Sequence, residues 1–292
     1  MATSVRTSLL IIGGAEDKVG RTTVLRRFLR LAGGSKARIV VIPTASSFPE
    51  EAVATYTAIF ERFGAAEVVT VDPPSRPAAA DPGLVQAIDN ATGVFMTGGN
   101  QLTLAQLFVG TPLADAITRA HARGAVVAGT SAGASIMSRF MISLGADGVT
   151  PRQRAGRLTS GLGLLPGVIV DQHFDQRARY GRKMSMVAGS PDLIGIGIDE
   201  DTAAEIHDGR LLTVLGSGAV FVIDARTAVS DVSEARRRAP LLVSGAVVHS
   251  LPAGATFDLS TASLVGFVEK HPDAIVMAAA KARLDSGTPA TR

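Results

Sequence analysis

The sequence predicts an α/β protein built on a doubly wound, mostly parallel sheet with a C-terminal antiparallel β-hairpin extension. Two observations support this fold class. In the first two hundred residues, short runs rich in Val and Ile alternate with longer helical patterns, which is typical of repeated strand, helix and strand units. From about residue 203 onward, short apolar segments follow one another closely and are divided by Asp-Gly, Gly-Ser-Gly and Ser-Gly, which favours hairpins.

The expected parallel strands are apolar without alternation, as strands buried on both faces of a sheet are. They are Ser8–Ile12, Ala37–Ile42, Glu67–Val71, Gly93–Met96 and Ala125–Ala128. Helices are expected between them at Thr22–Ala32, Glu50–Phe63 and Thr103–Arg123. Ligands of open α/β sheets bind beyond the carboxyl ends of the strands. The glycine- and proline-rich turns that follow these runs are therefore where functional residues are expected.

The C-terminal part is expected to add hairpin strands and a last helix to the same domain. The strands are Leu211–Leu215, Ala219–Ile223, Leu241–Val243 and Ala246–His249, and the helix lies near Pro272–Leu284. We find no internal repeat and no linker, so we expect one domain over residues 1–292. Residues 1–202 carry the candidate functional motifs of that domain.

The amino-acid composition limits the kinds of partner that this protein is expected to bind. The chain has 292 residues, 46% of them hydrophobic and 19% charged, which suits a globular protein with a large core. Aromatic residues make up only 4%, and 29 Lys and Arg stand against 26 Asp and Glu, a net charge of +3. Nucleic-acid binding, which uses aromatic platforms or basic stripes, is not expected. No apolar run approaches the roughly 20 residues that cross a bilayer, and no signal-peptide pattern is present, so we expect a cytoplasmic protein with no membrane partner.

The chain contains no cysteine. Disulfides, cysteine-based metal sites and a catalytic thiol are therefore excluded, and a covalent nucleophile must be an oxygen or nitrogen group. The cluster of Asp171, His173 and Asp175 could be interpreted as metal ligands. It offers one histidine, however, whereas iron sites of this kind use two. We expect neither a metal nor another cofactor.

Gly129-Thr130-Ser131-Ala132-Gly133 fits the G-x-S-x-G pattern. It follows an expected strand and precedes a helix-like segment, Ala134–Phe140, which is the context of a nucleophile elbow. Ser131 is therefore the candidate nucleophile, and the Ala132 N–H at the helix start is a candidate oxyanion donor. The alternative interpretation is a plain tight turn.

A second oxyanion donor is expected from the turn Thr97-Gly98-Gly99-Asn100-Gln101. Paired glycines let a backbone N–H approach a ligand closely, and Gly99 is the candidate. The same glycines would also suit a turn that simply needs a positive φ angle.

Of five histidines, His173 ends an apolar run and falls on the expected ligand-binding edge. It is the candidate base for the serine. His121, His249 and His271 lie in contexts that favour surface or half-buried positions. The acid that orients the imidazole is Glu200 or Asp175, and we favour Glu200, which follows the strand-like Leu193–Ile198. Since Asp199 and Asp201 flank Glu200, the sequence leaves open which carboxylate points at the site.

The segment Gln176–Lys183 concentrates four cations. Charge runs usually form a solvated face. Next to a candidate base, however, arginines also suit recognition of a substrate carboxylate, because the guanidinium fork matches a carboxylate.

Four motifs in this chain resemble, in the same order, those of the cyanophycinase family. These are serine peptidases of the clan that includes aspartyl dipeptidase, distantly related to class I glutamine amidotransferases. The motifs are Gly13-Gly14-Ala15-Glu16-Asp17-Lys18, Thr97-Gly98-Gly99-Asn100-Gln101, Gly129-Thr130-Ser131-Ala132-Gly133-Ala134 and the segment from Asp171-Gln172-His173-Phe174 to Arg182. The matching blocks run from residue 13 to about residue 202, and the last ninety residues add little. The amidotransferases carry a cysteine at the elbow where this chain has Ser131.

The resemblance implies a flavodoxin-like sheet, a homodimer and a Ser–His–Glu peptidase. The substrate would be cyanophycin, a polyaspartate whose side chains carry arginine, and the products β-aspartyl-arginine dipeptides. Ser131, His173 and Glu200 would be nucleophile, base and acid. The substrate-pocket residues implied are Gln101, Asp171, Gln172, Arg177, Arg179 and Arg182. Asp175 departs from the family pattern, where a small polar residue is expected.

The same motifs leave two alternative functions. Aspartyl dipeptidases share the serine elbow but have Asn-Pro where this chain has Asp171-Gln172, and they lack the arginine run. A catalytically silent binding protein for acidic peptides would use the same crevice. The joint presence of Ser131, His173 and Glu200 argues against that second alternative.

Overall fold

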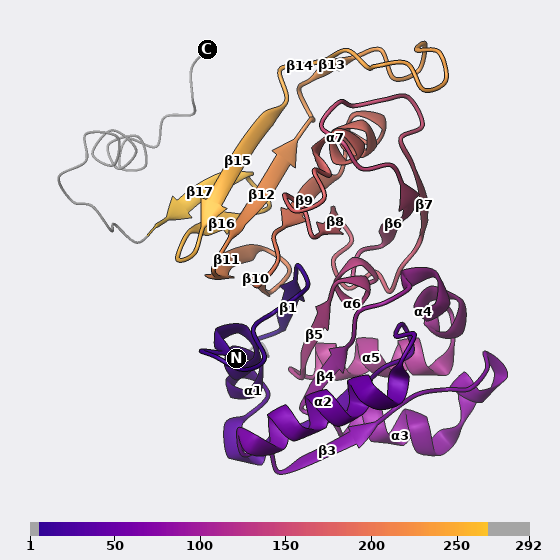
Figure 1. Ribbon diagram of the computed structural model, residues 1–292, viewed down its shortest axis with the longest axis vertical. Coiled ribbons are helices and arrows are strands. Elements are labelled where there is room, and N and C mark those ends of the chain that lie inside the picture. The colour runs from indigo at the N-terminus through magenta and orange to yellow at the C-terminus, as the bar shows by residue number, and fades with distance from the viewer. Residues whose placement is uncertain (1–5, 268–292) are drawn as a thin grey trace, which may run out of the picture.

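The computed structural model describes residues 6–267 of the chain (Figure 1). The expected helix near Pro272–Leu284 and His271 lie outside the described residues. Within them, the chain forms a mixed α/β fold with a large central sheet of nine strands, in the order β17-β16-β11-β10-β1-β5-β4-β2-β3. The α/β class and the central sheet with a parallel core are confirmed.

The parallel part of this sheet comes from the first 130 residues. Its strands are β1 (Ser8–Ile12), β2 (Arg38–Ile42), β3 (Glu67–Thr70), β4 (Gly93–Met96) and β5 (Val126–Thr130). Beyond β1 the sheet continues with antiparallel neighbours: β10 (Thr202–His207), β11 (Leu211–Gly216), β16 (Thr256–Asp258) and β17 (Ser263–Gly266). The open side of β1 is therefore occupied by β10.

A second sheet has four strands in the order β15-β12-β9-β8. They are β8 (Val168–Gln172), β9 (Ile194–Ile198), β12 (Ala219–Asp224) and β15 (Val247–Pro252), with β8 and β9 parallel and the others antiparallel. The sequence predicted that the runs before His173 and Glu200 end on the same sheet edge as Ser131. They instead form this separate sheet, because the edge of β1 that they would have joined is paired with β10.

Two smaller hairpins complete the strands. One is β6 (Phe140–Gly145) with β7 (Gly156–Ser160), and the other is β13 (Val229–Ser230) with β14 (Val243–Ser244). Neither β6 nor β7 was expected from the sequence.

Two of the expected helices differ in extent, and α3 and α7, named below, were not expected. The single helix expected at Thr103–Arg123 is two, α4 (Gln101–Phe108) and α5 (Pro112–Ala122). Gly110 between them has φ 70°, and Pro112 has no N–H to continue a helix, so the chain turns there. The other helices are α1 (Thr23–Leu31), α2 (Pro49–Arg62), α3 (Pro82–Asn90) and α7 (Tyr180–Gly189), with short 3₁₀ turns at Gly34–Lys36 and Pro77–Ala80.

The helix expected at Ala134–Phe140 is only the short α6 (Ala132–Ser135). The carbonyl groups of Ile136 and Met137 accept hydrogen bonds from Leu162 and Leu165, at 2.7 and 3.0 Å. These long-range partners replace the hydrogen bonds that would have extended the helix. The chain then enters β6 at Phe140.

The core lies on both faces of the central sheet. In β1, Leu9 and Ile11 pack into one apolar cluster, and Leu10 and Ile12 into the other. This alternation follows from the two-residue repeat of a strand, and it explains why the run is apolar without interruption. Both faces of β1 are thereby removed from water. Burial of each large apolar side chain stabilises the fold by roughly 1.5–3 kcal/mol.

No helix within residues 6–267 has the length and apolar character needed to span a membrane.

Candidate active site

Ser131 stands at a sharp turn between β5 and α6, with φ 52° and ψ −108°. The turn is possible because the residues two positions before and two positions after Ser131 are glycines. A Cβ atom on Gly129 would lie 2.2 Å from the Gly133 carbonyl oxygen, and one on Gly133 would lie 2.3 Å from that of Met96. The serine is therefore held in a strained backbone conformation, as the elbow pattern requires.

A hydrogen-bonded relay runs from Ser131 through His173 to Glu200. The Ser131 Oγ lies 2.9 Å from His173 Nε2, and His173 Nδ1 lies 2.6 Å from Glu200 Oε1. His173 is the first residue after β8, and Glu200 is the second residue after β9. These strands pair in parallel up to their last residues. The structure thus brings together the three residues that the sequence singled out.

The three competing carboxylates have other partners. Asp199 accepts hydrogen bonds from two backbone N–H groups, at 3.0 and 3.1 Å. Asp201 accepts the N–H of Asp17 at 2.8 Å, and Asp175 accepts the Tyr180 hydroxyl at 3.1 Å. Among these four carboxylates, Glu200 is the one hydrogen-bonded to the imidazole.

The environment of His173 keeps the imidazole neutral. Burial has the largest effect and lowers the pKa of His173 below its usual value. The hydrogen bond to Glu200 raises the pKa in part, and the charges of Arg177 and Arg179 lower it again. A neutral imidazole at Nε2 is able to accept a proton from the serine hydroxyl.

The loop after β1 fixes the backbone of all three segments that carry the relay. Three successive carbonyl groups, those of residues 12–14, accept hydrogen bonds from the N–H groups of Ser131 (3.0 Å), His173 (2.8 Å) and Asp201 (2.9 Å). Gly14, at φ 109°, also lies against the imidazole, where a Cβ would come within 2.3 Å of Cε1. This loop contains the glycine pair of the first motif, Gly13-Gly14. Sequence reasoning assigned these glycines no role in the site.

Glu16, in the same loop, is a second residue that sequence reasoning missed. Its side chain is buried, and its Oε2 accepts a hydrogen bond from the Thr130 hydroxyl at 2.6 Å. Its Oε1 accepts the Tyr56 hydroxyl and lies 3.1 Å from the Lys18 ammonium. Since Thr130 immediately precedes Ser131, this carboxylate holds the strand end that presents the serine. The motif containing Glu16 was visible in the sequence, but its burial beside the elbow was not.

The turn containing Gly98 and Gly99 lies against the serine. A Cβ on Gly98 would be 3.2 Å from the Ser131 Cβ, and one on Gly99, whose φ is 136°, would be 1.9 Å from the Ala45 carbonyl oxygen. At Gly99 the backbone therefore passes too closely for any side chain, and at Gly98 a side chain would crowd the serine. Beside Gly98 opens a cavity of about 300 Å³, lined also by Thr97, Lys18 and Phe48.

The predicted substrate residues fall into two groups. Gln101 Nε2 donates to the carbonyl oxygens of β6 residues 142 and 143, at 3.1 and 3.3 Å, and Gln172 Oε1 accepts the Ser135 hydroxyl at 2.8 Å. Arg177 is exposed, two residues beyond Asp175. The other group is ionic and buried.

Asp171, Arg179 and Arg182 form this buried ionic cluster. Arg182 binds Asp171 with two nitrogen atoms, its Nε at 2.8 Å, and Arg179 Nη1 lies 3.3 Å from the same carboxylate. Arg179 Nη1 also donates to the Gln172 carbonyl oxygen at 2.6 Å. The arginine run is therefore not a solvated face, and two of its guanidinium groups already hold a carboxylate of the chain.

Lys183, next to this cluster on α7, is fully buried and donates to the Ile169 carbonyl oxygen at 2.8 Å. Burial lowers the pKa of Lys183 from its usual value of 10.5 to about 7, more than the nearby Asp171 raises it.

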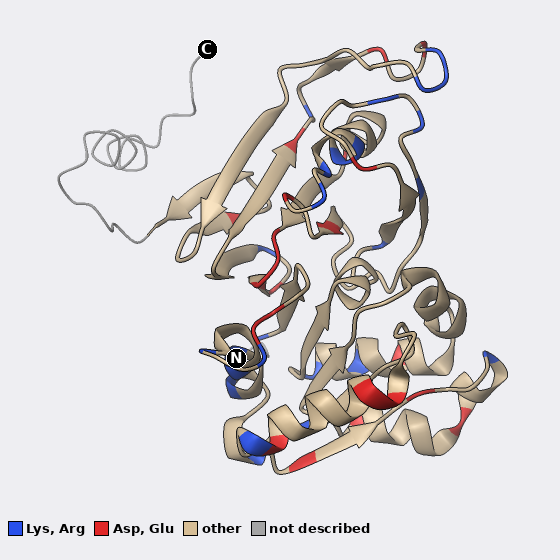
Figure 2. Cartoon of the chain, in the orientation of Figure 1, with Lys and Arg blue, Asp and Glu red and all other residues tan. Residues whose placement is uncertain are grey.

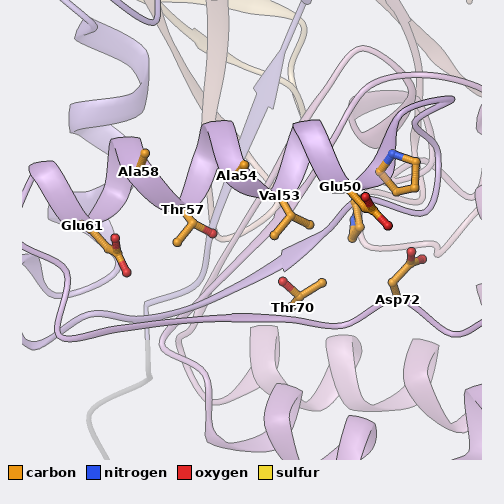
Figure 3. A pocket seen from close by; sticks show the side chains of 10 residues that line it. Glu50, Val53, Ala54, Thr57, Ala58, Glu61, Thr70 and Asp72 are labelled. Atoms are coloured by element: carbon orange, nitrogen blue, oxygen red, sulfur yellow. The ribbon is translucent and has the colours of Figure 1, made fainter.

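A shallow acidic groove of about 600 Å³ lies apart from the relay, between α2 and β3. Figure 3 shows Glu50 and Glu61 on the helix and Asp72 just after the strand. None of the residues singled out from the sequence as site residues lines this groove.

An α/β sheet that presents a serine on a strained turn, hydrogen-bonded to a histidine, defines the class of serine hydrolases. Within that class, the sequence profile of Peptidase family S51 matches residues 9–214. The chain belongs to this peptidase family.

Curated relatives agree with this assignment, and a solved structure has a similar fold. The chain is 42% identical to the cyanophycinase of Nostoc sp. (strain PCC 7120) over 260 residues, 88% of this chain and 87% of that one. It is 38% identical to the cyanophycinase of Geminocystis herdmanii over 269 residues, 91% of this chain and 98% of that one. The fold is similar to a peptidase from an acI-B1 Actinobacterium, with a TM-score of 0.64 and 22% identity over 88% of this chain and 99% of that one.

Proposed function

We propose that this protein is a cyanophycinase with a Ser–His–Glu triad. It would be a serine-type exopeptidase that hydrolyses the polyaspartate backbone of cyanophycin to β-Asp-Arg dipeptides. The observation that carries the proposal is the Ser131–His173–Glu200 relay, with separations of 2.9 and 2.6 Å, in a chain 42% identical to a cyanophycinase.

The chemistry starts with proton transfer from the Ser131 hydroxyl to His173 Nε2. The Ser131 oxygen then bonds to the backbone carbonyl carbon of an aspartyl residue, and the N–H groups of Ala132 and Gly99 stabilise the resulting oxyanion. The imidazolium, held by Glu200, gives its proton to the leaving amine as the C–N bond breaks. Water, activated by His173, then hydrolyses the ester and restores the serine.

Substrate binding in this proposal uses the residues around the arginine run. Each repeat of the polymer carries a free arginine carboxylate, which suits the exposed guanidinium of Arg177. Gln101 and Gln172 would shape the pocket next to the scissile bond. Arg179 and Arg182, with Asp171 between them, would form its charged wall.

The test is release of dipeptides from purified cyanophycin. We expect the wild type to release β-Asp-Arg, Ser131→Ala to lose at least about 10³-fold in rate, and the exposed-serine control Ser160→Ala to remain fully active. Cleavage of free α-aspartyl dipeptides but not of cyanophycin would favour an aspartyl dipeptidase. Residual activity of Ser131→Ala at the wild-type level would rule out the serine mechanism, and binding without turnover by the wild type would favour a silent receptor.

The choice of acid has its own test. Glu200→Gln should reduce kcat by about 10²–10⁴-fold because the imidazole loses its orienting carboxylate. Asp175→Asn should reduce kcat much less. The reverse order would overturn the assignment.

We further propose that the protein is a cytoplasmic homodimer. Light scattering on the purified protein at micromolar concentration tests the assembly, and a monomer mass would contradict it.

A further inference from the structure

Another cavity, of about 700 Å³, is lined by Arg182, the arginine that holds Asp171. Its walls are the loop that joins β6 to β7 and one residue of the loop between β13 and β14. The residues facing it include Asp147, Arg152, Gln153, Arg154, Arg182 and Arg238. It is larger than the cavity beside Gly98 and is distinct from it.

The cavity is strongly cationic. Four arginines face it, and Asp147 is its one acidic residue. Asp147 lies 3.2 Å from Arg179 Nε and 3.4 Å from Arg182 Nη1, so its charge is already shared. Arg182 has a carboxylate partner, Asp171. Within residues 6–267, no carboxylate lies within 4.0 Å of the guanidinium groups of the other three, Arg152, Arg154 and Arg238. Figure 2 shows the basic segments of both loops next to each other at the upper right.

The walls are fixed by backbone hydrogen bonds between the two loops. Gln153 N–H donates to the Ala239 carbonyl at 2.9 Å, and Arg238 N–H donates to the Gln153 carbonyl at 3.1 Å. The Arg152 N–H donates to the Ser185 hydroxyl at 2.9 Å, which ties the loop to α7. The arginines are thus carried on a preformed frame, which reduces the entropy that a ligand must overcome.

Two of the arginines have backbone angles that L-residues rarely adopt. Arg154 has φ 56° and Arg238 has φ 65°. Such conformations cost of order 1–3 kcal/mol each and persist where the surroundings impose them, often at binding sites. Arg152 Nη1 also donates to the Arg238 carbonyl at 3.2 Å, which ties the Arg152 side chain to the backbone of the other loop.

We propose that this cavity is a carboxylate-binding subsite for a part of the polymer remote from the scissile bond. The inference rests on the proposed function, because that substrate presents a free arginine carboxylate on every repeat. Guanidinium groups bind carboxylates through paired hydrogen bonds. The subsite adjoins the active site through Arg182, which is bound to Asp171, two residues before His173. A substrate of several repeats engages both sites at once and gains affinity by multivalency.

The test compares soluble β-Asp-Arg oligomers of two and of about six repeats. The double variant Arg154→Gln/Arg238→Gln should raise KM for the longer oligomer about tenfold more than for the shorter one. The control Arg21→Gln/Arg30→Gln removes two exposed arginines of the α1 region, with the same change in net charge, and should alter neither KM. An unchanged KM for the longer oligomer overturns the subsite. An equal rise for both lengths also overturns it, because the arginines would then belong to the main pocket.

A binding measurement separates this proposal from the proposed function. The inactive Ser131→Ala protein is sedimented with cyanophycin granules, with and without the two cavity substitutions. Loss of co-sedimentation in the cavity variant, at a sodium chloride concentration where the control variant still binds, supports the subsite whether or not the wild type hydrolyses the polymer. Equal co-sedimentation of both variants overturns it. A wild type that binds but does not cleave contradicts the proposed function alone.

Discussion

His173 is poised between opposing influences. Its burial and the arginines nearby favour the neutral imidazole, whereas Glu200 favours the charged one, and the pKa lies below the usual value. In the proposed mechanism the neutral form is the active base. Activity should therefore fall as pH decreases through that lowered pKa, so the acid limb of kcat/KM is expected below pH 6.5, the usual pKa of histidine.

Arg177 offers a way to move this limb. It is exposed, and its charge lowers the pKa of His173. Arg177→Gln should raise the pKa of His173, so the acid limb of kcat/KM moves to higher pH, in addition to any rise in KM. The pH profile of kcat/KM checks this, with Arg21→Gln as the control. A limb that stays in place or moves to lower pH would contradict the proposed electrostatic coupling.

The roles and contacts of some site residues could be predicted from the sequence, and those of others could not. The elbow at Ser131 depends on five neighbouring residues, so its pattern is visible in the sequence. Glu200 could not be separated from Asp199 and Asp201, because that choice depends on the backbone beyond β9, where Asp201 has φ 48°. The ion pairs of Arg179 and Arg182 with Asp171 were also hidden, because burial of a charge depends on packing between distant elements.

The loop after β1 acts as an element that positions others. Its carbonyl groups hold three site segments, and Glu16 holds the end of β5 through Thr130. The Thr130 and Tyr56 hydroxyl groups each donate to one oxygen of Glu16. Replacing the buried carboxylate by an amide of the same shape would turn an NH₂ donor toward one of these two hydroxyl groups. Buried groups left with such mismatched partners typically cost about 1–3 kcal/mol.

Glu16→Gln should therefore lower kcat about tenfold with little change in KM, since Glu16 supports Ser131 rather than the substrate. Steady-state kinetics and the free energy of urea unfolding measure the two effects. Glu61→Gln, at an exposed residue of α2 in the groove that lies apart from the relay, is the matched control. A rise in KM at unchanged kcat would contradict the positioning role.

Elements with a local signal were predicted well, and those set by distant contacts were not. Strands β1 and β4 lie where their apolar runs begin and end. The hairpin of β6 and β7 was missed because β6 contains exposed Phe140 and Leu144 beside polar positions, so it lacks a buried strand's pattern. The division into two sheets depends on which strand lies beside β1, and strand pairing is not encoded in any short window.

At the scale of the whole molecule, Lys183 makes stability depend on pH. Its pKa is about 7 in the folded protein and near 10.4 in an unfolded chain. Between these values the unfolded state binds more protons, so the free energy of unfolding rises with pH. At lower pH both states are protonated, and the full cost of burying the charge remains.

Lys183→Met should remove this dependence while keeping a side chain of similar length. Relative to the variant, the wild type should gain on the order of 2 kcal/mol in free energy of unfolding between about pH 7 and pH 9. Urea unfolding at both pH values measures the difference. Parallel pH dependence in the two proteins would show that Lys183 does not change its proton occupancy on folding.

The hydrogen bonds of the loop after β1 also affect the order in which the parts of the site form during synthesis. Asp17 bonds to a residue 184 positions later, and Glu16 to one 114 positions later. During synthesis this loop is made long before its last partner, Asp201, which follows Asp17 by 184 residues. Contacts of such long range form slowly. A growing chain therefore carries Ser131 for some time before the proposed base and acid, His173 and Glu200, are in place. The proposed triad is complete only once the two sheets have come together.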